Sequence, residues 1–220
     1  MILLKHTILT LCVLLSLPIV SLADTISDDE QTLRAIAIAA TVEDLIRTVR
    51  LQYTRIVVNK LEKEGTGSAL HFNKRGYVPL PAQFIRSIGN VKRGKSNSNS
   101  NSLPEHQFSL RSHWNINTSQ GLQDAFERNG WKFLIAQQDR HMETEKSLRY
   151  LTWKPYIKVE NTPSGKILRY MNADIASSIS CVKCHNKYEK TKTIMSYRRI
   201  NGTTRTKEFK LYDLVGSIAI

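Results

Sequence analysis

Residues 156–185 read YIKVENTPSGKILRYMNADIASSISCVKCH, and the expected architecture follows from them. Two runs rich in β-branched and aromatic residues, 148–159 and 167–173, flank the turn-forming segment Asn161–Gly165, which is typical of a β-hairpin. The second run is followed closely by the pentapeptide Cys181–His185. The stretch therefore predicts an antiparallel hairpin with a cysteine motif just beyond its second strand.

The pentapeptide has the spacing C-x-x-C-H that covalent attachment of haem c requires. The thiols of Cys181 and Cys184 can each add across one vinyl group of a porphyrin. The next residue, His185, then places an imidazole beneath the iron. We therefore predict one covalent haem c, bound through Cys181 and Cys184, with His185 as the proximal iron ligand.

Three other interpretations of the motif stay open. A redox dithiol would be expected in a thioredoxin-like strand-to-helix setting. A zinc site would need about four ligands, usually including a second Cys/His pair at regular spacing, and the sequence has no such pair. A plain disulfide between Cys181 and Cys184 would leave His185 unexplained.

The N-terminus has the pattern of a secretory signal. Residues 1–23 contain the basic Lys5, an apolar run over 8–20 and the small-residue cleavage pattern Ser21–Ala23. This run is short for a membrane span, although an uncleaved anchor remains the alternative. Cys12 would be removed with the signal. We therefore expect an exported, periplasmic protein, and haem c is attached outside the cytoplasm, so the motif and the signal agree.

The remaining segment, 24–220, is long enough for one substantial domain and short for two. The formal net charge of +13 is spread along the chain. In an exported protein this charge favours acidic partners, anionic lipid surfaces or simple solubility, and it gives no reason to expect nucleic acid. After removal of the signal we do not expect an integral membrane protein.

Helical periodicity dominates the first part of that segment. Apolar residues between Asp29 and Lys63 recur at steps of three and four, so the segment 24–63 is predicted to form one long N-terminal amphipathic helix. A shorter helix is predicted over 81–88, because proline suits the first helical position, and it is expected to stop at Gly89.

The Ser- and Asn-rich segment 92–103 predicts a disordered insertion within the domain. Further strands are predicted over 108–110 and within 209–220. A helix is expected to begin at a cap at 117–118, and Asn129–Gly130 is expected to end or bend it. The pattern as a whole predicts an α+β fold, with helices flanking an antiparallel sheet.

Several separated segments together resemble the PAS-like c-type haem domain of bacterial periplasmic sensors, a domain of unknown function. These segments are Gly76–Ala82, Ser112–Asn117, Leu122–Glu127, Leu168–Ala176, Cys181–Asn186 and Phe209–Gly216. The resemblance spans 33–220 and implies a PAS-like fold, one covalent haem and a role in sensing redox state or a small ligand. Family members often continue into a membrane helix and a cytoplasmic kinase or cyclase. This chain stops at Ile220, so we expect a free periplasmic module with a membrane-bound signalling partner, or a fragment of a longer sensor.

The resemblance also implies that the distal face of the haem lies towards the N-terminal helix and the sheet. Residues 24–70 contain no Cys, His or Met, so a strong distal ligand would have to come from elsewhere. The candidates are His71, His106, His113, His141, Met142, Met171 and Met195. Each has an ordinary alternative as a surface or core residue. We therefore hypothesise that the iron is five-coordinate or weakly capped in at least one oxidation state, with room for a diatomic ligand.

Three functional classes follow. The first is a haem-based sensory module, and the alternative is a monohaem electron carrier, which needs an accessible haem edge and a redox partner. A peroxidase-like enzyme would need distal acid–base residues, for which His71, His113 and Arg111 are candidates, and we do not expect one. Candidates for the pocket wall or the haem propionates are Tyr53, Arg111, Trp114, Trp153 and Tyr170.

Overall fold

The computed structural model describes residues 27–64, 73, 76–93, 107–163, 165–200 and 207–220. The predicted signal sequence, residues 94–103 of the predicted insertion, His71 and His106 lie outside these ranges. The chain divides into two compact units, 1–33 and 34–220, and of the first unit only the start of helix α1 is described. Within the described residues, no helix has an apolar stretch long enough to reach across a lipid bilayer.

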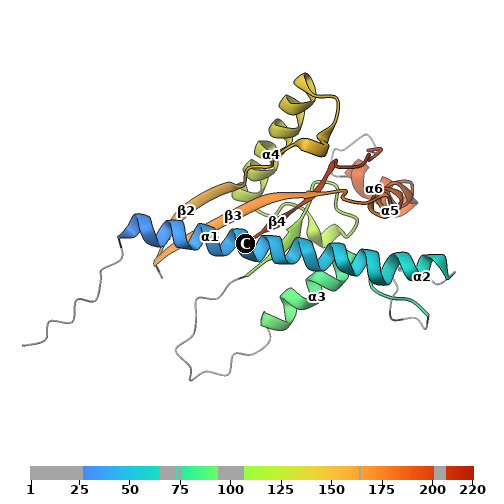
Figure 1. Ribbon diagram of the computed structural model, residues 1–220, viewed down its shortest axis with the longest axis horizontal. Coiled ribbons are helices and arrows are strands. Elements are labelled where there is room, and N and C mark those ends of the chain that lie inside the picture. The colour runs from blue at the N-terminus through green and yellow to red at the C-terminus, as the bar shows by residue number, and fades with distance from the viewer. Residues whose placement is uncertain (1–26, 65–72, 74–75, 94–106, 164, 201–206) are drawn as a thin grey trace, which may run out of the picture. The chain divides into compact units, whose positions relative to one another are not determined.

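In the described part of the chain, four antiparallel strands form one sheet in the order β1-β4-β3-β2 (Figure 1). The strands are β1 (Ser109–Arg111), β2 (Tyr156–Thr162), β3 (Gly165–Ile175) and β4 (Leu214–Ala219). Strands β1 and β4 correspond to the two strands expected near 108–110 and within 209–220. The sheet and the helices around it confirm the predicted α+β class.

The predicted hairpin is formed by β2 and β3, whose pairing runs from Tyr156 opposite Met171 to Thr162 opposite Gly165. Gly165 has a φ of 119°, a conformation that glycine adopts without strain. The first strand does not begin at residue 148 as predicted. Residues Leu148–Tyr150 instead form a short 3₁₀ turn, in which the Ser147 side chain accepts a hydrogen bond from the backbone N–H of Arg149 at 3.2 Å.

Helix α1 (Asp28–Tyr53) continues through the π-helical turn η1 (Thr54–Val58) into α2 (Asn59–Lys63), which confirms the long N-terminal helix. Its buried face is not the simple apolar stripe that the periodicity predicted. Glu43 is 5% exposed, whereas Leu45 is 61% exposed. The reason lies in the facing strand β3, which offers polar partners to this helix.

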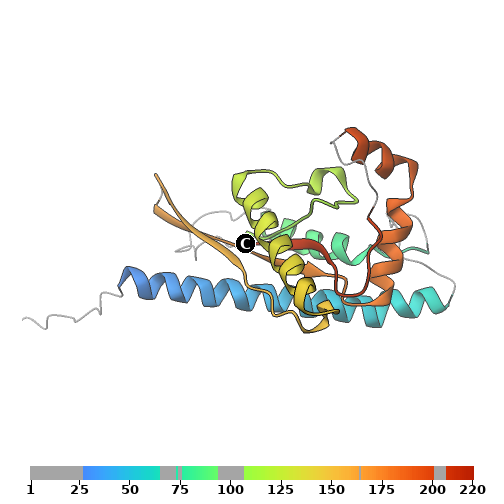
Figure 2. The same cartoon turned by 90° about the horizontal axis from the view of Figure 1, so that it is seen from above.

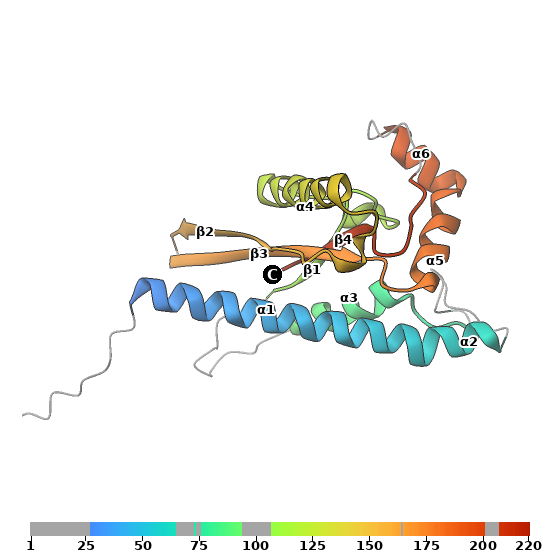
Figure 3. The same ribbon diagram turned by 45° about the horizontal axis from the view of Figure 1, so that its top comes forward.

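The helices cover both faces of the sheet (Figure 3). Helix α4 (Ala125–Thr144) packs on β2, β3 and β4, while α3 (Pro81–Arg93) packs near β1 on the same side as α1. Helices α5 (Ile179–Glu189) and α6 (Lys192–Ile200) contact each other beyond the end of β3 (Figure 2). The cysteine motif therefore sits on a helix at one end of the sheet.

Two apolar clusters fill the layers. Between α4 and the sheet lie Phe126, Trp131, Leu134, Met171, Ala173, Leu214 and Ala219. Between the sheet and the α1 and α3 helices lie Ile46, Ile85 and Ile218, with Phe84 and Phe108 packed against them. The sheet is thus buried on both sides. A third cluster of Ala176, Phe209 and Val215, with Cys181 and Val182 packed against it, lies where α5 begins.

Three predicted helix boundaries, at Gly89, at 117–118 and at Gly130, were wrong. Helix α3 continues through Gly89, where a Cβ would meet the Phe108 ring at 3.0 Å, so the glycine allows close packing. Asn117 caps a short 3₁₀ turn, and Asp124 caps α4 by accepting a hydrogen bond from the backbone N–H of Glu127 at 2.9 Å. The cap of the long helix was predicted at 117–118, and the structure places it at Asp124.

Helix α4 also continues through Gly130, which was expected to end or bend it. A Cβ on Gly130 would lie 2.6 Å from Sδ of Met171 on β3. Glycine therefore lets the helix approach the strand closely, and its role is in packing against the sheet.

Candidate functional site

The cysteine motif lies in the first turns of helix α5. Ser178 caps this helix, because its Oγ accepts a hydrogen bond from the backbone N–H of Cys181 at 3.3 Å. Residues 181, 184 and 185 are three and four positions apart, so a helix places them on one face. Both cysteines are free thiols in this structure. The local structure thus presents two sulfurs and one imidazole to the same space.

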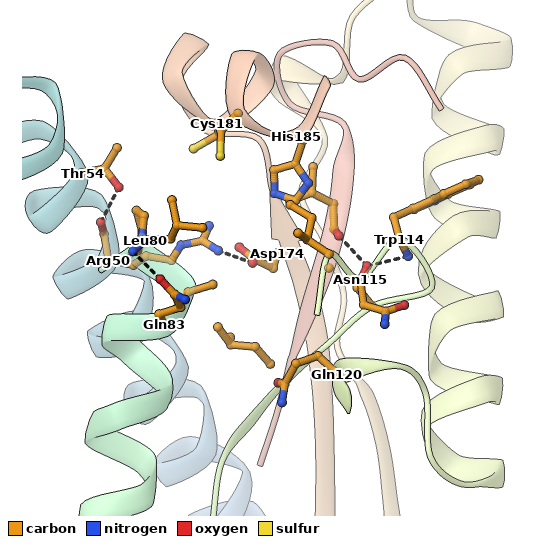
Figure 4. Close-up of a pocket in the computed structure, with 18 of the residues that line it drawn as sticks. Arg50, Thr54, Leu80, Gln83, Trp114, Asn115, Gln120, Asp174, Cys181 and His185 are labelled. Carbon is orange, nitrogen blue, oxygen red and sulfur yellow. Dashed lines mark hydrogen bonds and ion pairs between the residues drawn. The ribbon is translucent and has the colours of Figure 1, made fainter. Parts of the chain in front are cut away.

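That space is a cavity whose wall comes from six parts of the fold (Figure 4). From α5 come Cys181, Cys184 and His185, facing Arg50, Thr54 and Val58 of the α1–η1 helix and Leu80, Gln83 and Arg86 around the start of α3. The wall is completed by Asp174 and Ile175 of β3, Val215–Ser217 of β4, and Ser112 and Trp114–Asn117 after β1. Residues far apart in sequence therefore surround the motif.

The His185 ring is held inside this wall. It packs against the Phe209 ring with centroids 5.2 Å apart, and its Nδ1 is buried without a hydrogen-bond partner among the described residues. Burial lowers the pKa of His185 to about 4, with Arg50 and Arg198 adding to the effect and Asp174 opposing it. The imidazole is therefore neutral at pH 7, the form that ligates a metal ion.

The Cys184 thiol does not have the electrostatics of a reactive thiolate. Burial raises the pKa of Cys184 to about 12, and the nearby Cys181 and Glu62 add to the rise. Redox-active and zinc-binding cysteines depend on a stabilised thiolate, which requires a lowered pKa or the metal itself. The surroundings of Cys184 thus favour a neutral thiol over a reactive thiolate.

A buried ion pair crosses the cavity wall. Arg50 of α1 donates to Oδ2 of Asp174 at the end of β3 and lies 3.4 Å from the carbonyl oxygen of Ile175. The pairing of β3 with β4 is irregular between Asp174 and Ile175. Such irregularities redirect side chains and are common beside functional sites. Oδ1 of Asp174 is buried and has no partner in the described part of the chain.

This ion pair ends a row of polar contacts between α1 and β3. The Glu43 carboxylate accepts hydrogen bonds from the hydroxyl of Tyr170 and from Nδ2 of Asn172, the latter at 3.0 Å. Arg47 pairs with Glu43 and donates to the carbonyl oxygen of Ala173. Burial raises the pKa of the Tyr170 hydroxyl, and the neighbouring Glu43 raises it further. The long helix is therefore attached to the strand that leads to the cavity by directional contacts.

Sequence reasoning did not find Arg50, Asp174 or Arg86. A signal for the first two was present, since residues 170, 172 and 174 alternate along a strand and polar residues 43, 47 and 50 recur at helical spacing.

Of the expected wall residues, Arg111 and Trp114 line the cavity, whereas Tyr53, Trp153 and Tyr170 lie elsewhere. The Arg111 guanidinium pairs with Glu127 at 2.9 Å.

The described candidates for a distal iron ligand do not line the cavity. Met171 is fully buried in the core beneath α4. His113 is exposed and packs its ring edge-on against Trp114 at 4.9 Å, while His141 places Nε2 3.0 Å from the carbonyl oxygen of Ser147. Met142 and Met195 are 46% and 44% exposed. His71 and His106 lie outside the described residues.

Comparisons with known proteins give one match. The model of the family described as Tll0287-like matches residues 24–220, nearly the whole of the chain beyond the predicted signal. No curated protein and no solved structure matches the chain. Because the matched family is a domain of unknown function, evidence on activity has to come from the site itself.

Proposed function

The chain belongs to the Tll0287-like family, and from its site we propose that it is a periplasmic monohaem c-type sensory module. The signal would be the redox state of the haem iron or a small diatomic ligand bound to it. The proposal is supported by the C-x-x-C-H motif, by the signal-like N-terminus and by the cavity on which the motif residues converge.

The residues in the cavity wall fit a covalent haem. Cys181 and Cys184 are free thiols on one helical face, as two thioether bonds require, and His185 is a neutral imidazole beside them. Arg86 lines the cavity without an ion-pair partner in the described part of the chain, and a guanidinium suits a haem propionate. Haem c would supply an iron that changes oxidation state and accepts a small ligand.

One observation favours a sensor. Among the described residues that line the cavity, His185 is the sole histidine and there is no methionine. A second strong protein ligand would then have to come from His71 or His106. Without such a ligand, a haem iron held here would be open to water or a diatomic molecule. An open position is what a ligand-responsive haem needs.

A structural connection between the cavity and the long N-terminal helix supports the same function. The π-helical turn Thr54–Val58 lies in the cavity wall, and such turns occur frequently at functional sites. Ser180 of α5 donates a hydrogen bond to Oδ1 of Asn59 at 2.7 Å, which joins the motif helix to the end of the long helix. A ligand at the haem can shift the protein between two arrangements of these helices only if it binds one arrangement more tightly than the other.

The test is expression with a haem c maturation system, followed by absorption and electron paramagnetic resonance spectra of both oxidation states. We expect a covalently bound haem whose spectra change on addition of carbon monoxide to the reduced protein or nitric oxide to either form. The double variant His71→Ala/His106→Ala should bind these gases as the native chain does. A low-spin, six-coordinate iron in both states, indifferent to both gases, would contradict the sensor.

A second candidate, the electron carrier, is favoured by charge. Lys183, Lys187 and Lys190 on and just after the motif helix are exposed. Exposed cations near a haem steer acidic redox partners and make their association depend on salt. Rapid, salt-dependent electron exchange together with a gas-insensitive iron would favour this alternative.

A further inference from the structure

Two buried polar atoms in the cavity wall lack a hydrogen-bond partner in the described part of the chain: Nδ1 of His185 and Oδ1 of Asp174. Both residues line the same cavity, and Figure 4 draws Asp174 between Arg50 and His185. A hydrogen-bond donor and an acceptor are thus left unsatisfied in one region. This is unfavourable unless both become hydrogen-bonded when the ligand binds.

We propose that Asp174 is the positioning residue for His185: in the haem-loaded protein its Oδ1 accepts a hydrogen bond from Nδ1–H, which leaves Nε2 to bind the iron. This inference rests on the proposed haem function and deepens it. A histidine that ligates a metal usually donates its other N–H to a carboxylate, a carbonyl or water. Asp174 is a buried carboxylate with one oxygen still available.

The fold explains why that oxygen is available. Oδ2 of Asp174 is held by Arg50, so the carboxylate is fixed by one oxygen and presents the other. The irregular pairing between Asp174 and Ile175 falls where β3 reaches the cavity. The Arg198 guanidinium, the other cation that acts on His185, is paired with Glu189 and does not compete for Asp174.

The bond would tune the iron. A carboxylate that accepts the Nδ1 proton makes the imidazole a stronger electron donor, which stabilises ferric over ferrous iron and lowers the reduction potential. Arg50 draws charge from the same carboxylate and weakens this effect. Because Arg50 belongs to α1, a shift of the long helix changes the donor strength at the iron, and by reciprocity a change at the iron biases the helix.

The test compares the haem-loaded native protein with Asp174→Asn and with the double variant Arg50→Gln/Asp174→Asn. The readouts are the reduction potential and the iron–histidine stretching frequency in resonance Raman spectra of the ferrous protein after photolysis of carbon monoxide. Asp174→Asn should raise the potential and lower the frequency, because an amide oxygen is a weaker acceptor. The double variant removes both charges, keeps the net charge and should show the same lowered frequency. Asp124→Asn, which removes a carboxylate on the α4 side and keeps the helix cap, should change neither quantity.

The outcomes separate the possibilities. If the double variant returns the stretching frequency to the native value, Asp174 acts through its charge alone and the hydrogen bond is refuted. An unchanged frequency in Asp174→Asn refutes it equally. Asp174→Asn leaves Arg50 buried without its partner and could fail to fold for that reason. In that case the double variant, which leaves no unpaired charge, decides alone. Absence of covalent haem from the native protein would instead refute the proposed function, and intact mass shows this before any variant is made.

Discussion

Arg50 on the long helix α1 and Asp174 at the end of β3 form a buried ion pair across 124 residues of sequence, and both line the cavity that contains the cysteine motif. A buried pair of this kind contributes little net stability compared with an apolar pair, but removal of one partner is costly. Its value here lies in position, because it joins the long helix to a strand residue in the wall of the cavity that also contains His185.

The first prediction concerns the thiols. The double variant Cys181→Ala/Cys184→Ala should lose covalent haem, while each single variant should retain it through one thioether bond. Intact mass spectrometry and haem staining of a denaturing gel measure this directly. Lys183→Ala, an exposed substitution between the two cysteines, is the matched control and should retain the full mass of one haem. Retention of covalent haem by the double variant would contradict the attachment.

The second prediction concerns Glu43. Glu43→Ala leaves the buried donors of Tyr170 and Asn172 and the Arg47 guanidinium without their acceptor. We expect a loss of about 3 kcal/mol in the free energy of unfolding, as for other broken buried charge networks. Urea unfolding measures it. The neighbouring Asp44→Ala, at an exposed position, should change stability by about 0.5 kcal/mol or less. Equal effects of the two variants would show that the polar row between α1 and β3 is not a stabilising feature.

The third prediction concerns the contact of α4 with β3. Gly130→Ala would place a Cβ 2.6 Å from Sδ of Met171, so overpacking should destabilise the fold by about 1–3 kcal/mol despite alanine's better helix propensity. Adding Met171→Ala should recover part of that loss in a double-mutant cycle, since the two sites are in contact. Asn129→Ala, one position earlier and exposed, should not be destabilising. Additive effects of the two core changes would contradict the contact.

The fourth prediction concerns pH. Partial burial raises the pKa of Asp124, but its hydrogen bonds to the backbone N–H of Glu127 and to Arg169 outweigh this and leave the pKa below the ordinary 3.8. A carboxyl whose pKa is lower in the folded state stabilises the fold above its unfolded pKa and loses that contribution as the pH falls through the folded value. Asp124→Asn keeps the cap but loses the charge. We expect it to be less stable than the native chain by about 0.5 kcal/mol at pH 7.

That stability difference should shrink as the pH falls below 3.8. Thermal or urea unfolding of both proteins between pH 7 and pH 2.5 checks this. A difference that stays constant across the range would show that the Asp124 charge does not contribute.

Much of the architecture was readable from local patterns. Steps of three and four residues predicted the long helix, the turn-forming segment 161–165 predicted the β2–β3 hairpin, and the apolar run near the C-terminus predicted β4. Helix boundaries were less readable, because Gly89 and Gly130 serve close packing against Phe108 and Met171. A glycine that stops a helix and a glycine that lets a helix approach its neighbour look the same in one sequence.

The sequence alone determined the motif residues Cys181, Cys184 and His185, because their chemistry depends on spacing along the chain. Only the tertiary structure decided what surrounds them: Arg50 from α1, Asp174 from β3 and Arg86 from α3. The physical reason is the separation along the chain over which each kind of interaction acts. Covalent spacing and helical or strand periodicity act over a few residues, whereas burial, ion pairing and unsatisfied hydrogen-bonding atoms arise from contacts between segments that only folding brings together.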